Sequence, residues 1–180
     1  MIPIVICSSN VYSSVVTITI EAIERAFGVA DLFEFHVIGL TENINSDRRA
    51  DYYIYPEPDT DAWSTRVKYG INSIPHNYFV LITEDILFKN GSVSYLKELY
   101  DSTVLSGKDY LRLSPFPGPD DFRQTVGFVG SECLHRISMQ PSIWRKEYLL
   151  SLLKEGESIW EFELYGSFRT HRKDEVYALG

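Results

Sequence analysis

Short apolar runs rich in β-branched residues alternate along the chain with longer stretches whose apolar residues recur every three or four positions. The runs predict buried strands, and the periodic stretches predict amphipathic helices. The expected strands of the first two thirds of the chain are 2–7, 33–40, 51–55, 78–82 and 110–113. The expected helices are 15–26, 61–74 and one that begins at 92. Such alternation predicts right-handed crossovers, and therefore an α/β fold with a mostly parallel central sheet and helices on both faces.

The last third of the pattern is less regular. Residues 114–132 are rich in proline and glycine, which favours a long irregular or hairpin segment of the kind that often forms a binding loop. A strand over 134–139 and an amphipathic helix that begins at Pro141 are expected next. Ser158 and Glu161 have the spacing of a capping box, which predicts a last helix through Phe168. No linker or repeat interrupts the pattern, so residues 1–180 are interpreted as a single domain.

Composition narrows the class of protein. The chain has 180 residues and a net charge of −8, which argues against a nucleic-acid partner. No stretch is apolar enough to span a membrane, and the first residues do not resemble a signal peptide, which favours a cytoplasmic location. Cys7 and Cys133 are expected to be free thiols. One basic cluster predicts a solvated face first, and a peripheral contact with an anion or membrane second: Arg169, His171, Arg172 and Lys173.

The predicted topology indicates where a ligand binds. In parallel α/β sheets, ligands bind outside the carboxyl ends of the strands. The sequence places polar residues directly after three predicted strands: Ser8, Ser9, Asn10, Thr41, Glu42, Glu84 and Asp85. The glycine-rich dinucleotide and phosphate-loop motifs are absent, as are the H-E-x-x-H and G-x-S-x-G motifs, and a Ser/His or Cys/His nucleophile is not proposed.

Glu84 and Asp85 follow the most apolar predicted strand. Two adjacent carboxylates repel each other unless a cation or hydrogen-bond donors neutralise them. Hard divalent cations prefer oxygen ligands and also bind phosphate oxygens. The pair therefore predicts a metal site, with the alternative that Asp85 only caps a turn.

Trp160-Glu161-Phe162-Glu163 interleaves two carboxylates with large aromatic residues. Partly desolvated surroundings raise the pKa of a carboxyl group toward the range of a useful general base. The capping box already accounts for Glu161. Glu163 has no such explanation, so it is the favoured catalytic residue, with Glu161 as the second candidate.

Four segments in this order resemble small bacterial glycosyltransferase-like proteins of the GT-A fold: Glu84-Asp85, Tyr110–Leu113, Ser138–Lys146 and Trp160–Glu163. Glu84-Asp85 resembles the acidic metal-binding motif that follows the fourth strand in that family. It departs from the D-x-D form, since Leu87 stands where a further acid often falls. Glu163 with Arg169 resembles the acid-then-arginine pattern around the base of inverting members, although Phe162 replaces the usual paired acid.

The resemblance implies a hexosyltransferase-like enzyme that moves a sugar from a nucleoside-diphosphate-sugar to a hydroxyl acceptor such as a carbohydrate. It implies a Mn²⁺ or Mg²⁺ ion on Asp85 and Glu84, with Glu163 as general base. The residues expected on the donor side are Ser8, Ser9, Asn10, Glu42, Arg66, Lys68 and Glu84, and those on the acceptor side are Gln140 and Trp160. Arg66 and Lys68 are equally well explained as ordinary helix-surface charges, and Trp144 as a core residue. His171 is a conceivable further ligand, although an exposed position explains it better.

Two other functions stay open from the sequence. A non-catalytic nucleotide-sugar or carbohydrate-binding module on the same fold would fit the weak acidic motif. It would also fit a chain that stops soon after the expected base, where members of the family often continue, so the domain is either truncated at its C-terminus or minimal. A nucleotidyltransferase would need a glycine- and arginine-rich loop after the first strand, where this chain has Ser8-Ser9-Asn10-Val11.

Overall fold

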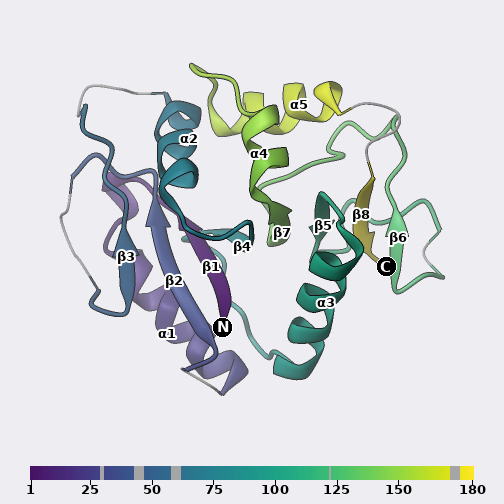
Figure 1. The fold of residues 1–180 in the computed structure, drawn as a ribbon, viewed down its shortest axis with the longest axis horizontal. Helices are drawn as coiled ribbons and strands as arrows, with labels where there is room; N and C mark the ends of the chain where they lie inside the picture. Colours follow the sequence, from purple (N-terminus) through teal and green to yellow (C-terminus); the bar gives the residue numbers. More distant parts are fainter. Residues whose placement is uncertain (29–30, 43–46, 58–61, 122, 171–174) are drawn as a thin grey trace.

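The computed structural model describes residues 1–28, 31–42, 47–57, 62–121, 123–170 and 175–180. Within these ranges, eight strands form one sheet in the order β3-β2-β1-β4-β7-β5-β8-β6 (Figure 1). The strands are β1 Ile2–Cys7, β2 Phe33–Ile38, β3 Ala50–Tyr52, β4 Tyr78–Thr83, β5 Tyr110–Arg112, β6 Val126–Phe128, β7 Ser142–Arg145 and β8 Val176–Leu179. The helices are α1 Val15–Phe27, α2 Trp63–Ser73, α3 Val93–Ser106, α4 Lys146–Leu152, α5 Ile159–Arg169 and a short 3-10 turn, Asn10–Tyr12.

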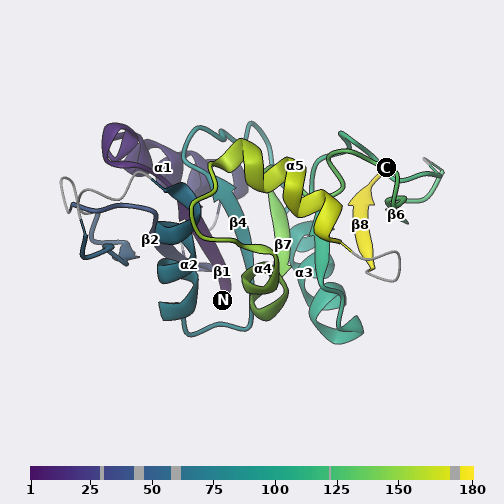
Figure 2. The same cartoon turned by 90° about the horizontal axis from the view of Figure 1, so that it is seen from above.

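The sheet is mixed but mostly parallel, as the alternation predicted. β3, β2, β1 and β4 are parallel neighbours, and β5 pairs in parallel with β8. β7 runs antiparallel between β4 and β5, and β6 is antiparallel to β8 at the edge. Six strands therefore point the same way, and their carboxyl ends lie at one end of the sheet. Helix α5 lies over the same side of the sheet as α2 and α4 (Figures 1 and 2), and its first turns reach the carboxyl ends of β1 and β4.

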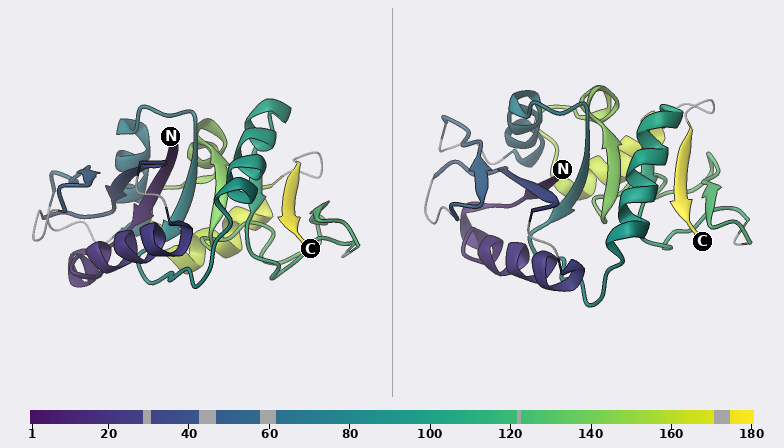
Figure 3. Two further views of the ribbon diagram at one scale, coloured as in Figure 1. Left: turned by 90° about the horizontal axis from the view of Figure 1, so that it is seen from below. Right: turned by 60° about the horizontal axis from the view of Figure 1, so that its bottom comes forward.

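Helices cover both faces of the sheet and enclose two apolar layers. The buried side chains of α1 and α3 pack with Ile4, Ile6 and Val80 on one face. Those of α2, α4 and α5 pack with Val5 and Leu81 on the other face. Figure 3 shows the molecule with α1 and α3 toward the viewer. The alternation of β1 and β4 residues between the two layers explains why both strands are apolar throughout.

The prediction of a helix from Pro141 was wrong for its first residues. Residues 142–145 form β7, and the helix begins at Lys146. Ile143 pairs with Val80 in one apolar layer, and Trp144 pairs with Phe79 in the other. Consecutive residues that face opposite layers have the period of a strand. The helical spacing holds only from Tyr148 onward.

The prediction of a strand over 134–139 was also wrong, because this segment forms turns. Its backbone N–H groups donate to side chains instead of a neighbouring strand. Ile137 donates to Ser167 Oγ at 3.1 Å, and Ser138 donates to Tyr110 Oη at 3.3 Å. Met139 donates to Glu163 Oε1 at 2.7 Å. Side-chain acceptors thus satisfy the backbone without a sheet ladder.

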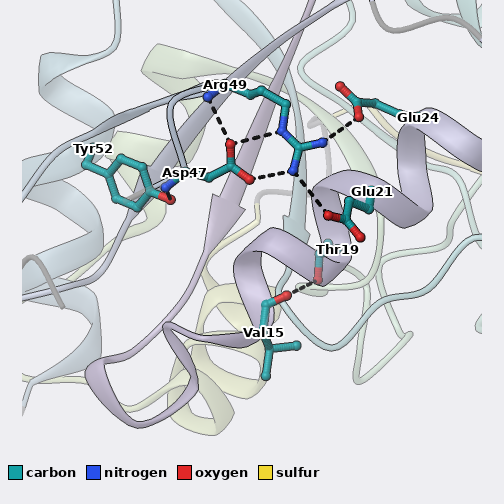
Figure 4. A network of polar contacts seen from close by, with 7 residues as sticks. All are labelled: Val15, Thr19, Glu21, Glu24, Asp47, Arg49 and Tyr52. Atoms are coloured by element: carbon teal, nitrogen blue, oxygen red, sulfur yellow. Dashed lines mark hydrogen bonds and ion pairs between the residues drawn. The ribbon is translucent and has the colours of Figure 1, made fainter. Parts of the chain in front are cut away.

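An ion-pair network holds α1 against the start of β3 (Figure 4). The Arg49 guanidinium donates to Asp47 Oδ1 at 2.9 Å and to Glu24 Oε2 at 2.7 Å, and it lies 3.7 Å from Glu21 Oε1. The hydrogen bonds from Arg49 lower the pKa of Asp47. Tyr52 of β3 accepts from the Asp47 backbone at 2.8 Å. This network fixes the edge of the sheet far from α5.

Two further features of the described residues bear on the sequence predictions. Cys7 and Cys133 are free, as expected. None of the helices in the described ranges is both long and apolar enough to cross a membrane.

Candidate active site

A cavity of about 510 Å³ opens at the carboxyl ends of β1 and β4. Its walls come from the turn after β1, the first residue of α2, the end of β4, the segment before β7 and the first turns of α5. Seven residues that the sequence analysis singled out line this one cavity: Ser8, Ser9, Glu84, Asp85, Gln140, Trp160 and Glu163. The position matches the general rule for ligands of α/β sheets.

Hydrogen bonds to neighbouring residues fix Glu84 and Asp85 at the end of β4. The Glu84 N–H donates to the Cys7 carbonyl at 3.3 Å, and Thr19 of α1 donates its hydroxyl to the Glu84 carbonyl. Thr83 donates its hydroxyl to Asp85 Oδ1 at 2.6 Å. No lysine, arginine or histidine among the described residues forms an ion pair with either carboxylate. Two oxygen-donor groups therefore line the cavity without a cationic partner from the described part of the chain.

Burial raises the pKa of Glu84, and the neighbouring Asp85 charge raises it further. A carboxyl group whose pKa is raised by folding opposes folding at pH values above its ordinary pKa, because the folded state resists its ionisation. Glu84→Gln is therefore expected to raise the melting temperature of the metal-free protein at pH 7. The gain should shrink as the pH falls below the ordinary carboxyl pKa. Thermal melts from pH 4 to pH 7 would measure it, and an equal gain at both ends would contradict this account.

Glu163 lines the same cavity as the acidic pair and comes from α5. Its Oε1 accepts from Ser138 Oγ at 2.9 Å and from the Met139 N–H at 2.7 Å. Its Oε2 makes no hydrogen bond to any described residue. One oxygen thus fixes the carboxylate, and the other is available to a ligand in the cavity.

The packing of α5 against the segment before β7 fixes this arrangement. Gly166 lies against Ile137, since a Cβ on Gly166 would come within 2.7 Å of the Ile137 Cδ1 atom. Ser167 accepts from the Ile137 N–H at 3.1 Å, one turn beyond Glu163. Ser138 was missed by the sequence analysis, because nothing in the spacing relates it to a carboxylate 25 residues away.

Glu161 has the capping role and does not line the cavity. Its Oε2 accepts from the Ser158 N–H and hydroxyl, both at 2.8 Å, and the Ser158 hydroxyl accepts from the Glu161 N–H at 3.3 Å. The capping box is therefore confirmed. These hydrogen bonds lower the pKa of Glu161, which is opposite to the shift that a general base needs. The geometry favours Glu163 over Glu161.

Ser158→Ala is expected to lower the free energy of unfolding by about 1 kcal/mol, because α5 would lose the side-chain acceptor at its N-cap. Urea unfolding would measure the change. The matched substitution Ser94→Ala, on the exposed first turn of α3, should change stability by less than about 0.5 kcal/mol. An equal loss in both variants would mean that the cap is not specific to α5.

Four residues predicted on the donor side lie outside the cavity lining. Asn10 bridges two loops: its Nδ2 donates to Thr41 Oγ1 at 2.7 Å, and its Oδ1 accepts from the Thr41 N–H at 2.9 Å. Glu42 is exposed beside it. On α2, Lys68 forms an ion pair with Glu155 at 3.0 Å, and Arg66 is half-buried. Asn10 thus shapes the turn that carries Ser8 and Ser9.

Arg169 forms no ion pair with Glu163, the residue that precedes it in the acid-then-arginine pattern, and pairs with another acid. It forms a bidentate ion pair with Glu157, with Nη1–Oε1 and Nη2–Oε2 distances of 2.7 and 2.8 Å. The Glu157 N–H donates to Ser64 Oγ at 2.9 Å, so the pair joins the end of α5 to α2. The rest of the basic cluster, His171 included, lies outside the described residues.

Two aromatic side chains that the sequence analysis did not assign to a site, Trp63 and Tyr12, line the cavity together with Trp160. Trp63 stands at the start of α2 and packs on Phe162, with ring centroids 5.5 Å apart. Tyr12 and Trp160 line the rim and are 56% and 76% exposed. Exposed aromatic rings beside carboxylates make good stacking surfaces.

Cys7 lies at the base, where burial raises its pKa to about 12, so it is a neutral thiol and not a nucleophile.

Comparison with known proteins identifies the fold. No model of a known protein family and no curated protein sequence matches the chain. Solved structures do match: S. aureus TarS residues 1–349 aligns over 99% of this chain with a TM-score of 0.59 at 11% identity. The chain has a GT-A-like, glycosyltransferase-type fold.

Two further structures match over 99% of this chain. S. aureus TarS 1–349 in complex with UDP-GlcNAc has a TM-score of 0.58 at 12% identity, and HddC from Yersinia pseudotuberculosis has a TM-score of 0.56 at 15% identity. The chain spans 60% and 58% of the two TarS chains and 90% of HddC. At these identities the likeness concerns the GT-A-like fold alone.

Proposed function

We propose that this protein transfers a sugar from a nucleoside-diphosphate-sugar to a hydroxyl acceptor, with the cavity at the carboxyl ends of β1 and β4 as its active site. One observation carries the proposal. One cavity is lined both by an acidic pair, Glu84-Asp85, that has no cationic partner among the described residues, and by Glu163, whose Oε2 accepts no hydrogen bond from them. Binding of UDP-GlcNAc by TarS, which shares the fold, supports a donor of this chemical class.

The acidic pair fits a divalent cation. Both groups are hard oxygen donors, they lack a basic partner among the described residues, and the raised pKa of Glu84 reflects its uncompensated burial. When bound, Mg²⁺ or Mn²⁺ would offset the negative charge that develops on the diphosphate leaving group. Asp85 and Glu84 supply only two ligand groups, so the phosphate oxygens and water would complete the coordination.

Glu163 is proposed as the general base. Its free Oε2 takes the proton of the acceptor hydroxyl, while that hydroxyl oxygen forms a bond to the anomeric carbon and the bond from this carbon to the diphosphate oxygen breaks. The N–H of Met139 and the hydroxyl of Ser138 hold the carboxylate still during this step. A fixed carboxylate loses less entropy on reaching the transition state.

The walls of the cavity are proposed to divide between the two substrates. Ser8 and Ser9, at the end of β1, line the cavity together with the acidic pair and are assigned to the donor. Gln140 and Trp160 line it together with Glu163 and are assigned to the acceptor. Trp160 offers an exposed aromatic face of the kind that stacks on sugar rings.

Turnover tests this function. A panel of nucleoside-diphosphate-sugars would be incubated with the protein and Mn²⁺, and release of the nucleoside diphosphate measured with and without simple sugar acceptors. The proposal predicts release from one donor, raised by an acceptor. Binding of a donor without release at any acceptor concentration would instead favour a non-catalytic nucleotide-sugar-binding module.

A further inference from the structure

A second cluster of metal-binding side chains lies on the α2 face of the sheet, away from the cavity. Glu34 and His36 stand two residues apart on β2 and so share a face. His76 lies between the end of α2 and the start of β4. One ligand atom from each of the three lies within 4.8 Å of the others. None of the three residues lines the active-site cavity.

Both imidazoles direct a nitrogen toward the same carboxylate oxygen. The Nε2 atoms of His36 and His76 lie 3.3 and 3.0 Å from Glu34 Oε1. Despite these short distances, neither Nε2 atom has a hydrogen bond of ordinary angular geometry, which places Glu34 Oε1 off the axis of each ring nitrogen. The close contact with His76 nevertheless lowers the pKa of Glu34. His36 is fully buried, so its Nε2 is an unpartnered polar atom in the protein interior. Buried nitrogens are rarely left in this state.

A metal ion accounts for this off-axis arrangement. An ion lies on the lone-pair axis of each imidazole, so the other ligand atoms lie beside that axis and not on it. With bonds of about 2.0–2.1 Å, neighbouring ligands of a tetrahedral zinc ion are roughly 3.3–3.4 Å apart. The two nitrogen–oxygen distances are close to that edge length. Glu34 and His76 have side chains 28% and 31% exposed, so an ion and a fourth, water ligand have a path to the site.

The surroundings of His36 match those of a metal-bound histidine. Its other ring nitrogen, Nδ1, lies 3.2 Å from the Tyr53 hydroxyl and 3.9 Å from Asp51 Oδ2. Metal-binding histidines commonly use the second nitrogen for such a contact, which fixes the ring and directs the first nitrogen at the ion. The Tyr53 contact therefore leaves Nε2 of His36 for a ligand bond.

We propose that Glu34, His36 and His76 bind a zinc ion. Two imidazoles and one carboxylate are a ligand set that Zn²⁺ accepts, unlike the all-oxygen pair in the cavity, which suits Mg²⁺ or Mn²⁺. The ion joins β2 to the turn between α2 and β4, across β1, which lies between the two strands. The site has a structural role at the amino-terminal side of the sheet. This inference does not rest on the proposed transferase activity.

Zn²⁺ titration of the chelator-treated full chain, with any histidine tag removed, tests the site. Isothermal titration calorimetry is expected to show one saturable Zn²⁺ site. His76→Gln and Glu34→Gln should each weaken it at least tenfold, and Tyr53→Phe should weaken it by about 10–100-fold, the usual effect of losing an outer partner. His135→Gln, at an exposed histidine outside the cluster, and Asp85→Asn, in the cavity, should leave it unchanged.

Co²⁺ gives a second measurement that does not depend on affinity. The wild-type protein with Co²⁺ should show the strong visible absorption of a four-coordinate ion, and Glu34→Gln should lose it. Glu34 and His76 have partly exposed side chains, so we expect both variants to fold. Circular dichroism would confirm this. Absence of saturable Zn²⁺ binding in the wild type would overturn the proposal. So would binding that persists in both variants. Turnover of a nucleotide-sugar is expected to persist in His76→Gln, which separates the two proposals.

Discussion

Glu163→Gln is expected to lower the rate of sugar transfer by about 10²–10⁴-fold, the usual contribution of a general base. The substituted amide keeps an oxygen that accepts from Met139 and Ser138, so the local structure should survive. Affinity for the nucleoside diphosphate should change by less than about twofold, because the acidic pair and the Ser8 side of the cavity are untouched. Initial rates of nucleoside diphosphate release, together with calorimetric binding, would measure both quantities.

Glu161→Gln is the matched control for this prediction. It changes a carboxylate two residues away on the same helix, but one that caps the helix outside the cavity. Transfer should stay within about threefold of the wild-type rate. If Glu161→Gln lost as much activity as Glu163→Gln, or if Glu163→Gln kept the full rate, Glu163 would not be the base.

Arg112→Met is expected to lower the free energy of unfolding by roughly 3–5 kcal/mol. Arg112 is fully buried, and its guanidinium donates to the backbone carbonyls of Pro117, His135 and Arg136 and to the Tyr110 hydroxyl. The substitution leaves three carbonyl oxygens without this donor, and an unpaired buried acceptor costs about 1–3 kcal/mol. Urea unfolding monitored by tryptophan fluorescence would measure the loss.

Arg123→Met provides the comparison for Arg112. The Arg123 side chain is 90% exposed, and Asp121 is its one ion-pair partner among the described residues. Its loss should change stability by less than about 0.5 kcal/mol, as is usual for surface substitutions. A change below about 1 kcal/mol in Arg112→Met would show that the buried arginine does not organise the segment between β5 and β7. That segment includes Ser138 and Met139, so Arg112→Met is also expected to reduce transfer in the folded fraction.

The sequence predicted well those parts of the fold that rest on a single local pattern. β1 and β4 are six-residue apolar runs, and no other element type explains them. The rule that ligands bind at the carboxyl ends of parallel strands then placed Ser8, Glu84 and Asp85 together. The capping box at Ser158 was equally local. Each of these predictions needed only residues within a few positions of one another.

The parts that were missed depend on contacts between residues far apart in the chain. β7 is four residues long and runs directly into α4, so its apolar residues merge with the helical pattern. β8 was not predicted, and its parallel partner β5 lies more than sixty positions earlier in the chain. The turns at 134–139 depend on four distant side chains that form hydrogen bonds with the backbone N–H and C=O groups of this segment. These side chains are Arg112, Tyr110, Ser167 and Glu163. Local propensity contains no information about such partners.

The same reason explains why two predicted cations do not reach the cavity. Lys68 was expected on the donor side and Arg169 beside the catalytic base, and the sequence alone could not exclude either role. The structure pairs them with Glu155 and Glu157. These acids follow α4, and the loop that brings them to α2 and α5 is defined only by the tertiary fold.

The most direct test of the active site is thermal stability with a panel of nucleoside diphosphates, with and without Mn²⁺, on the wild type and Asp85→Ala. A ligand that binds only the folded state raises the melting temperature, by an amount equivalent to about 2.7 kcal/mol at a concentration 100 times its Kd. We predict a Mn²⁺-dependent rise with one nucleotide in the wild type, and no such rise in Asp85→Ala. The absence of a rise with every nucleotide, or an equal rise in both proteins, would contradict a metal-assisted donor site at Glu84-Asp85.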